Sequence, residues 1–103
     1  MSFDGPVPVE LKLADKWTGP ALFERLENQL CGDYLRDNRS TRGLFVLVYR
    51  GEKAGWDVPG EANRVDFAGL IAELQNHWER ISPRFPGVDE VTVIGIDLTQ
   101  RTT

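Results

Sequence analysis

Glu10 and Lys12 are the residues of this chain whose types and spacing most directly suggest chemistry. On a β-strand, side chains two positions apart leave the same face, about 7 Å from each other along the strand. A carboxylate there can bind a divalent metal, and the neighbouring ammonium can orient a water molecule or stabilise an anion. The same two charges are also common on solvated strand faces, where they form a weak exposed ion pair. The pair by itself favours this second, structural interpretation.

The strand that would position this pair spans roughly residues 7–14. Its apolar and polar residues alternate with a period of two, which is typical of a half-buried strand. The charged pair points to one face, and the apolar residues point to the other: Val7, Val9, Leu11 and Leu13.

A helix is predicted to follow over residues 20–35. Thr18 is a suitable N-cap, and Pro20 fits the first helical turn. One apolar stripe at helical spacing marks the face that we expect to be buried: Leu22, Phe23, Leu26, Leu30 and Tyr34.

The second predicted helix begins after the N-cap candidate Asp66 and ends before Pro83. Its apolar residues follow the i, i+3, i+4 pattern, which predicts a helix packed against the sheet. The residues of this stripe are Phe67, Leu70, Ile71, Leu74, Trp78 and Ile81.

Two further strands are predicted over residues 44–49 and 91–98, and both are apolar on both faces. Such strands are typical of a sheet covered on both sides. Strands separated by helices pair in parallel through right-handed crossovers. The fold class is therefore α/β: a β-α-β-α-β arrangement in two or three layers, with a small, mostly parallel sheet and two helices. Three strands leave edges and part of a face uncovered, which predicts a homo-oligomer or a larger protein partner.

Length, composition and charge limit the domain organisation, the metal sites and the partners that this chain can have. The chain has 103 residues, which fits one α/β domain over 1–103 or the C-terminal part of a larger one. Cys31 and His77 are its one cysteine and its one histidine, too few for a disulfide or a zinc site. Neither an apolar run that could span a bilayer nor a signal sequence is present, which predicts a soluble, cytoplasmic chain without a membrane partner. The net charge of −4 argues against tight nucleic-acid binding but leaves nucleic acid open as a partner.

For four side chains outside the charged pair, we expect structural rather than chemical roles. His77 is expected to be an exposed helix residue and Cys31 a small core residue. Trp17 and Trp56 could stack on a ligand, but packing in the core or in a loop is the favoured role.

The strand with Glu10 and Lys12, the helix with Gln29 and Tyr34, and the apolar strand after it together resemble the second half of a PD-(D/E)xK, restriction-endonuclease-like domain. The resemblance covers roughly residues 6–50. It implies a partial restriction-endonuclease-like fold and a metal-dependent cleavage of nucleic acid.

The resemblance also implies residue roles. Glu10 would bind Mg²⁺, and the carbonyl of Leu11 would contribute a second oxygen. Lys12 would position the attacking water or stabilise the phosphate. Gln29 would lie near the site and Tyr34 would support it. Hard oxygen ligands for Mg²⁺ and a cation near the developing charge are what phosphodiester hydrolysis requires.

The chain departs from the family pattern in two respects. The family has an Asp on the strand before the Glu-x-Lys strand, but here only residues 1–5 precede it. Gln29 and Tyr34 are five residues apart instead of four, a rotation of about 140° beyond one full turn. Since one carboxylate is a poor Mg²⁺ site, we expect no catalysis by the chain alone.

Three hypotheses follow, and whether the chain is an enzyme stays open among them. The preferred one is an incomplete nuclease-like domain that acts as an interaction or regulatory module, or as the C-terminal piece of a nuclease. The second is a metal-dependent DNA endonuclease or exonuclease that dimerisation or an absent N-terminal part completes, with Mg²⁺ bound only then. The third is a small α/β binding protein unrelated to nucleases, in which Glu10 and Lys12 are surface charges.

Overall fold

The computed structural model describes residues 7–34 and 41–99, apart from the side chains of Cys31, Asp33 and Tyr34. Strands and helices alternate along the chain as the sequence predicts. In chain order the elements are β1 (Val9–Leu13), η1 (Ala14–Lys16), α1 (Gly19–Glu24), η2 (Arg25–Tyr34), β2 (Arg42–Tyr49), α3 (Phe67–Ile81), η3 (Ser82–Arg84) and β3 (Glu90–Asp97).

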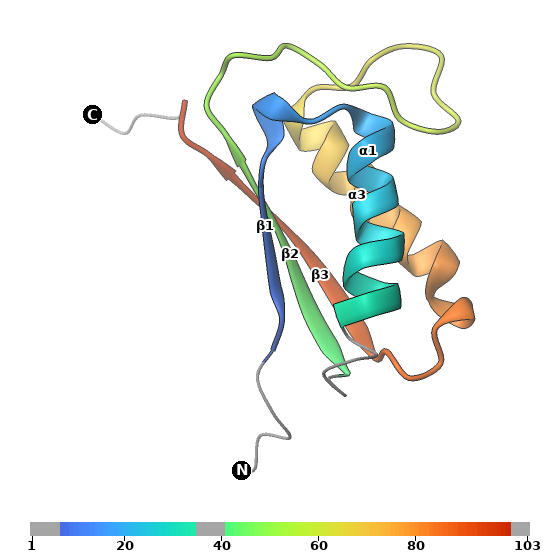
Figure 1. Cartoon of the computed structure of the whole chain (residues 1–103). Helices are drawn as coiled ribbons and strands as arrows, with labels where there is room; N and C mark the ends of the chain where they lie inside the picture. The colour runs from blue at the N-terminus through green and yellow to red at the C-terminus, as the bar shows by residue number, and fades with distance from the viewer. Residues whose placement is uncertain (1–6, 35–40, 100–103) are drawn as a thin grey trace.

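The three strands form one sheet in the order β1-β2-β3, and both neighbouring pairs are parallel. Both connections carry their helix over the same face of the sheet (Figure 1). We call this side the helix face and the opposite side the open face. The α/β fold class is confirmed, with two layers. The expectation that β2 is covered on both faces is wrong, because the described helices lie on one side only.

The first helical segment begins as the sequence predicts. The side chain of Thr18 accepts a hydrogen bond from the backbone N–H of Ala21 (3.3 Å), and Pro20 stands in the first turn. After α1 the helix continues without interruption as the wider π-helical segment η2. Leu22 of α1 and Leu26 and Leu30 of η2 are completely buried.

The core lies between the helix face and the helices. Asp66 caps α3 by accepting from the backbone N–H of Gly69 (2.8 Å), as expected. The stripe of α3 is confirmed as core, with Leu70 and Leu74 completely buried and Ile71 partly buried. The other fully buried apolar side chains on the sheet are Phe45, Leu47 and Val91.

The long connection between β2 and α3 is attached to this core through Trp56. The side chain of Trp56 is 1% exposed, and its indole N–H donates to the carbonyl of Ala14 (3.1 Å). Its ring contacts those of Tyr49 and Phe67. The prediction that Trp56 serves packing is confirmed. Within residues 7–34 and 41–99, no helix is long and apolar enough to cross a membrane.

Candidate functional site

Glu10 and Lys12 point to the helix face of the sheet. The parallel register places Glu10 beside Phe45 and Lys12 beside Leu47, both of which are buried under the helices. Glu10 is 7% exposed, and its carboxylate forms an ion pair of 2.6 Å with Lys12. The interpretation of this pair as an exposed surface pair is therefore wrong: the pair is closed and largely shielded from water.

Trp17 and Arg25 complete the surroundings of Lys12. The Lys12 ammonium lies 4.7 Å from the centre of the Trp17 ring, and the Arg25 guanidinium lies 5.1 Å from the same ring. Cations near an aromatic face are attracted by its quadrupole. Trp17 thus packs between the charged strand and the first helix, and Glu10 supplies the balancing negative charge.

The structure places the remaining residues of the predicted site in different ways. Gln29 is on η2, half-buried, in the layer above the helix face. Tyr34 is the last residue of η2, and its side chain is outside the described residues. The side chain of Leu11 points to the open face and is 63% exposed.

The chemistry available to this cluster is that of one carboxylate already paired with a lysine. Across the part of the chain that the structure describes, no three His, Cys, Asp or Glu residues gather so that they could hold a metal ion. A carboxylate bound to an ammonium can orient that ammonium toward an anion, but Mg²⁺ sites are usually built from several oxygen ligands.

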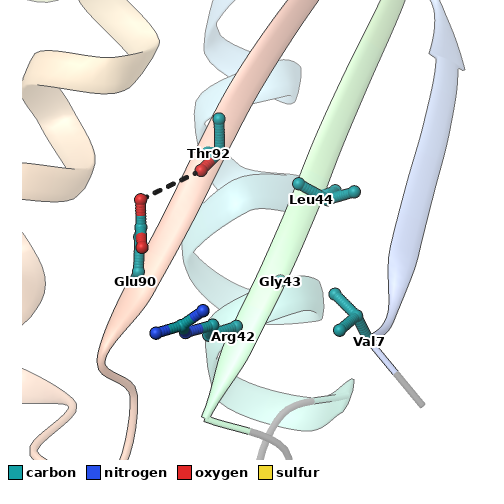
Figure 2. A pocket seen from close by; sticks show the side chains of 6 residues that line it. All are labelled: Val7, Arg42, Gly43, Leu44, Glu90 and Thr92. Atoms are coloured by element: carbon teal, nitrogen blue, oxygen red, sulfur yellow. Dashed lines mark hydrogen bonds between the residues drawn. The ribbon is translucent and has the colours of Figure 1, made fainter. Parts of the chain in front are cut away.

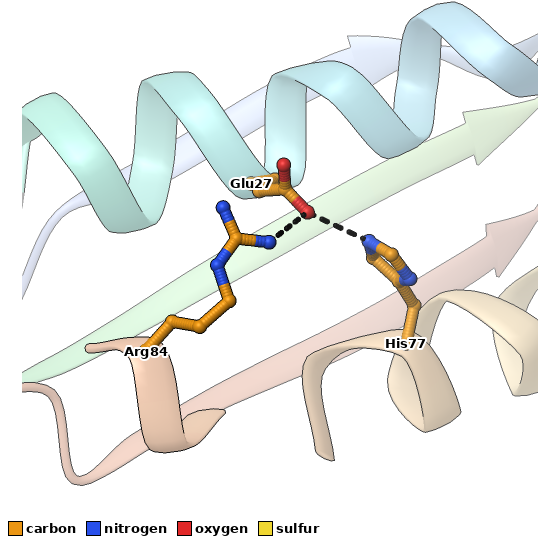
Figure 3. A network of polar contacts seen from close by, with 3 residues as sticks. All are labelled: Glu27, His77 and Arg84. Atoms are coloured by element: carbon orange, nitrogen blue, oxygen red, sulfur yellow. Dashed lines mark hydrogen bonds and ion pairs between the residues drawn. The ribbon is translucent and has the colours of Figure 1, made fainter. Parts of the chain in front are cut away.

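A second polar network, which the sequence did not reveal, joins three helical segments (Figure 3). The carboxylate oxygen Oε1 of Glu27 lies 3.3 Å from Nε2 of His77 and 3.2 Å from Nη1 of Arg84. The His77 ring also meets Phe23 edge-on at 5.1 Å. His77 is thus not the exposed helix residue that its position off the apolar stripe predicted: its side chain is 19% exposed.

Asp15 anchors the loop at the carboxyl end of the sheet, where parallel α/β sheets commonly bind ligands. Its carboxylate accepts hydrogen bonds from the backbone N–H groups of Arg50 (2.8 Å) and Glu52 (2.6 Å). Slight burial raises the pKa of the Asp15 carboxyl, but these backbone donors outweigh that effect and leave the pKa below its usual value. Asp15 therefore serves as an ionised structural cap, and its oxygens are already engaged by the protein.

The open face of the sheet is apolar. Among the described residues, its exposed large apolar side chains are Val7, Val9, Leu11, Ile94, Ile96 and Leu98. At the end of the face where β2 and β3 begin lies a shallow pocket of about 290 Å³ (Figure 2). Apolar Val7 and Leu44 line it on one side, and Arg42, Glu90 and Thr92 give it a polar margin.

Comparisons of the chain with protein-family models, with curated proteins and with solved structures found no match. Any functional conclusion therefore depends on the geometry of the described residues.

Proposed function

We propose that this chain is an interaction module of α/β fold that associates through the uncovered surface of its sheet, with a second copy of itself as the first partner. The apolar open face is the observation that carries this proposal. Val9 and Leu11 of β1 are 54% and 63% exposed, and Ile96 of β3 is 42% exposed. Contiguous apolar patches larger than a few hundred Å² are unusual on monomers and commonly mark association sites.

The parallel pairing of the strands strengthens this argument. An antiparallel sheet commonly has one solvated face, but sheets made only of parallel strands are almost always covered on both faces. This sheet is entirely parallel, and its central strand places Leu44, Val46 and Val48 on the open face. A covering layer from outside the described chain would complete the usual arrangement of such a sheet.

A nuclease completed by another chain, or by further protein, is the second candidate. Glu10 and Lys12 face the helix layer that holds Gln29, so all three belong to the same side of the sheet. That arrangement is compatible with the nuclease-like interpretation of this segment. The closed Glu10–Lys12 pair, with one carboxylate, favours binding over catalysis in the isolated chain.

We expect no nuclease activity from the pure chain. Plasmid DNA incubated with the protein and Mn²⁺ should remain supercoiled, because one lysine-paired carboxylate does not make a metal site. The control is a Glu10→Ala variant purified in the same way. Cleavage by the original chain that Glu10→Ala abolishes would contradict the interaction-module proposal and support the enzyme.

We expect the chain to self-associate at micromolar concentration. Light scattering should give a mass above the 11.6 kDa of one chain, increasing with concentration. Leu11→Lys places a charge on the apolar surface and should weaken association by about tenfold or more. Ala72→Lys adds the same charge on the exposed side of α3 and should leave the mass unchanged. A monomer mass at every concentration would overturn self-association.

A further inference from the structure

We propose that the self-association contact is the outer edge of β1, where the β1 strand of a second copy pairs in antiparallel orientation about a two-fold axis at Leu11. This inference rests on the proposed function and specifies its partner, its surface and its register. Three independent features of the described residues lead to it: the state of the two sheet edges, the direction of the β1 backbone groups, and the order of the charges along β1.

The two edges of the sheet differ. At the outer edge of β3, the side chain of Gln75 donates to the carbonyl of Val91 (3.0 Å) and accepts from the backbone N–H of Val93 (2.9 Å). The amide of Gln75 therefore occupies hydrogen-bonding groups that an added strand would need. At the opposite edge, β1 pairs with β2 alone among the described residues. Unpaired strand edges are templates for pairing with another chain.

The backbone of β1 presents the groups that an antiparallel partner needs. The carbonyl of Pro8 accepts from the N–H of Leu44 (2.9 Å), so it faces β2. Because peptide groups alternate along a strand, those of Val9, Leu11 and Leu13 face outward. With the two-fold axis at Leu11, Leu11 lies opposite its own copy and Val9 lies opposite Leu13 of the second copy. About six backbone hydrogen bonds form in this register.

The charges of β1 are self-complementary in the same register. Glu10 of one copy then lies opposite Lys12 of the other, and the reverse pair forms on the other side of the axis. Directly opposed side chains on antiparallel strands have Cβ atoms about 4.5–5.5 Å apart, and opposite charges there are favourable. The existing Glu10–Lys12 pair at 2.6 Å thereby becomes part of a network of four alternating charges. The two Glu10 carboxylates lie diagonally, each beside a lysine, which does not favour a shared metal site.

The apolar side chains on the other face of β1 extend this contact. Val9 and Leu11 are more than half exposed in the single chain. In the paired arrangement Leu11 meets Leu11 of the second copy and Val9 meets its Leu13, so the open faces of the two copies join into one apolar surface across six strands. The edge contact thus includes the part of the apolar open face that β1 supplies.

Charge reversal tests the register directly. Glu10→Lys places like charges opposite each other at both contacts, and so does Lys12→Glu. Each variant alone should therefore lose the dimer in light scattering. A 1:1 mixture of the two variants restores opposite charges across the axis, so the dimer mass should return. The Glu10–Lys12 ion pair within one chain cannot explain this rescue. In the mixture each chain still carries two like charges at positions 10 and 12, so only a contact between chains can restore opposite charges. Circular dichroism spectra check that each variant is folded.

Cysteine cross-linking tests the same contact without a change of charge. In a Cys31→Ala background, Leu11→Cys should form a disulfide-linked dimer under mild oxidation. Its two Cα atoms would be about 5.5 Å apart in a hydrogen-bonded pair, a separation that a disulfide can bridge. Ile94→Cys is the matched control, since Ile94 is 37% exposed on the same open face but belongs to β3. It should form no disulfide-linked dimer.

The outcomes separate this inference from the function on which it rests. Cross-linking through Ile94→Cys but not Leu11→Cys, in a chain that does associate, would indicate face-to-face packing and overturn the edge contact while self-association stands. Association that neither charge reversal affects would also overturn the register. A wild-type chain that stays monomeric at all concentrations overturns both the edge contact and self-association.

Discussion

Replacement of Gly19 by alanine is expected to destabilise the protein by about 3 kcal/mol, as for severe overpacking. A Cβ atom at Gly19 would lie 1.7 Å from the carbonyl oxygen of Asp57 and 2.8 Å from its carbonyl carbon. These are backbone atoms, so no side chain can rotate away. The segment can move only by displacing Trp56 and Val58, which flank Asp57 and are both buried.

Denaturation in urea, followed by tryptophan fluorescence, measures this loss of stability. Gly87→Ala is the matched control, because a Cβ atom there has no neighbour within 4 Å among the described residues. The control should change the free energy of unfolding by less than about 0.5 kcal/mol. Equal stability of the two variants would mean that the start of α1 does not pack closely on the loop around Asp57.

Leu74→Ala is expected to cost about 2–5 kcal/mol of stability, the range measured for buried leucines. Leu74 is completely buried in the middle of α3, so truncation removes apolar contacts and leaves a cavity between the helix and the sheet. Urea denaturation of both variants should show the loss for Leu74→Ala but not for Leu98→Ala, a residue that is 58% exposed. A change at Leu74 below about 0.5 kcal/mol would exclude it from the core.

The order of elements could be predicted from the sequence because local patterns determine it. The stripe of α3 repeats at helical spacing, and Thr18 and Asp66 each cap the helix that they were expected to cap. Parallel pairing follows from the alternation of strands and helices. Each of these signals lies within about a dozen residues, close enough for hydrophobic periodicity and capping chemistry to specify it.

The burial of the charged pair could not be predicted in the same way. Alternation along β1 shows that its two faces differ, but not which of them the helices cover. The central strand β2 is apolar on both faces and gives no further preference. The register that sets Glu10 beside Phe45 and Lys12 beside Leu47 is a property of the paired strands. The charged pair by itself favoured a solvated surface pair, whereas the assembled sheet places it on the helix face beside Trp17.

Polar contacts between distant segments were missed for a related reason. Glu27 and His77 are 50 residues apart, and Gln75 is 18 residues from Val93. Off the apolar stripe of α3, His77 and Gln75 have the pattern of ordinary surface residues. The packing of α3 against η2 brings His77 to the Glu27 carboxylate, and its packing against β3 brings Gln75 to the edge of that strand.

In the proposed self-association, the side chain of Gln75 would limit how large an assembly of this chain can grow. A sheet with two available edges can add copies head to tail, each β1 on the β3 of the next copy, and such a heterologous contact leads to an open filament. The Gln75 amide already occupies the Val91 carbonyl and the Val93 N–H at one of these edges. Under the proposal, growth would be restricted to the symmetric pairing of β1 with β1, and the resulting dimer would have no unpaired β1 edge. A single glutamine would thus block the addition of further copies at the β3 edge and favour a dimer over a fibre.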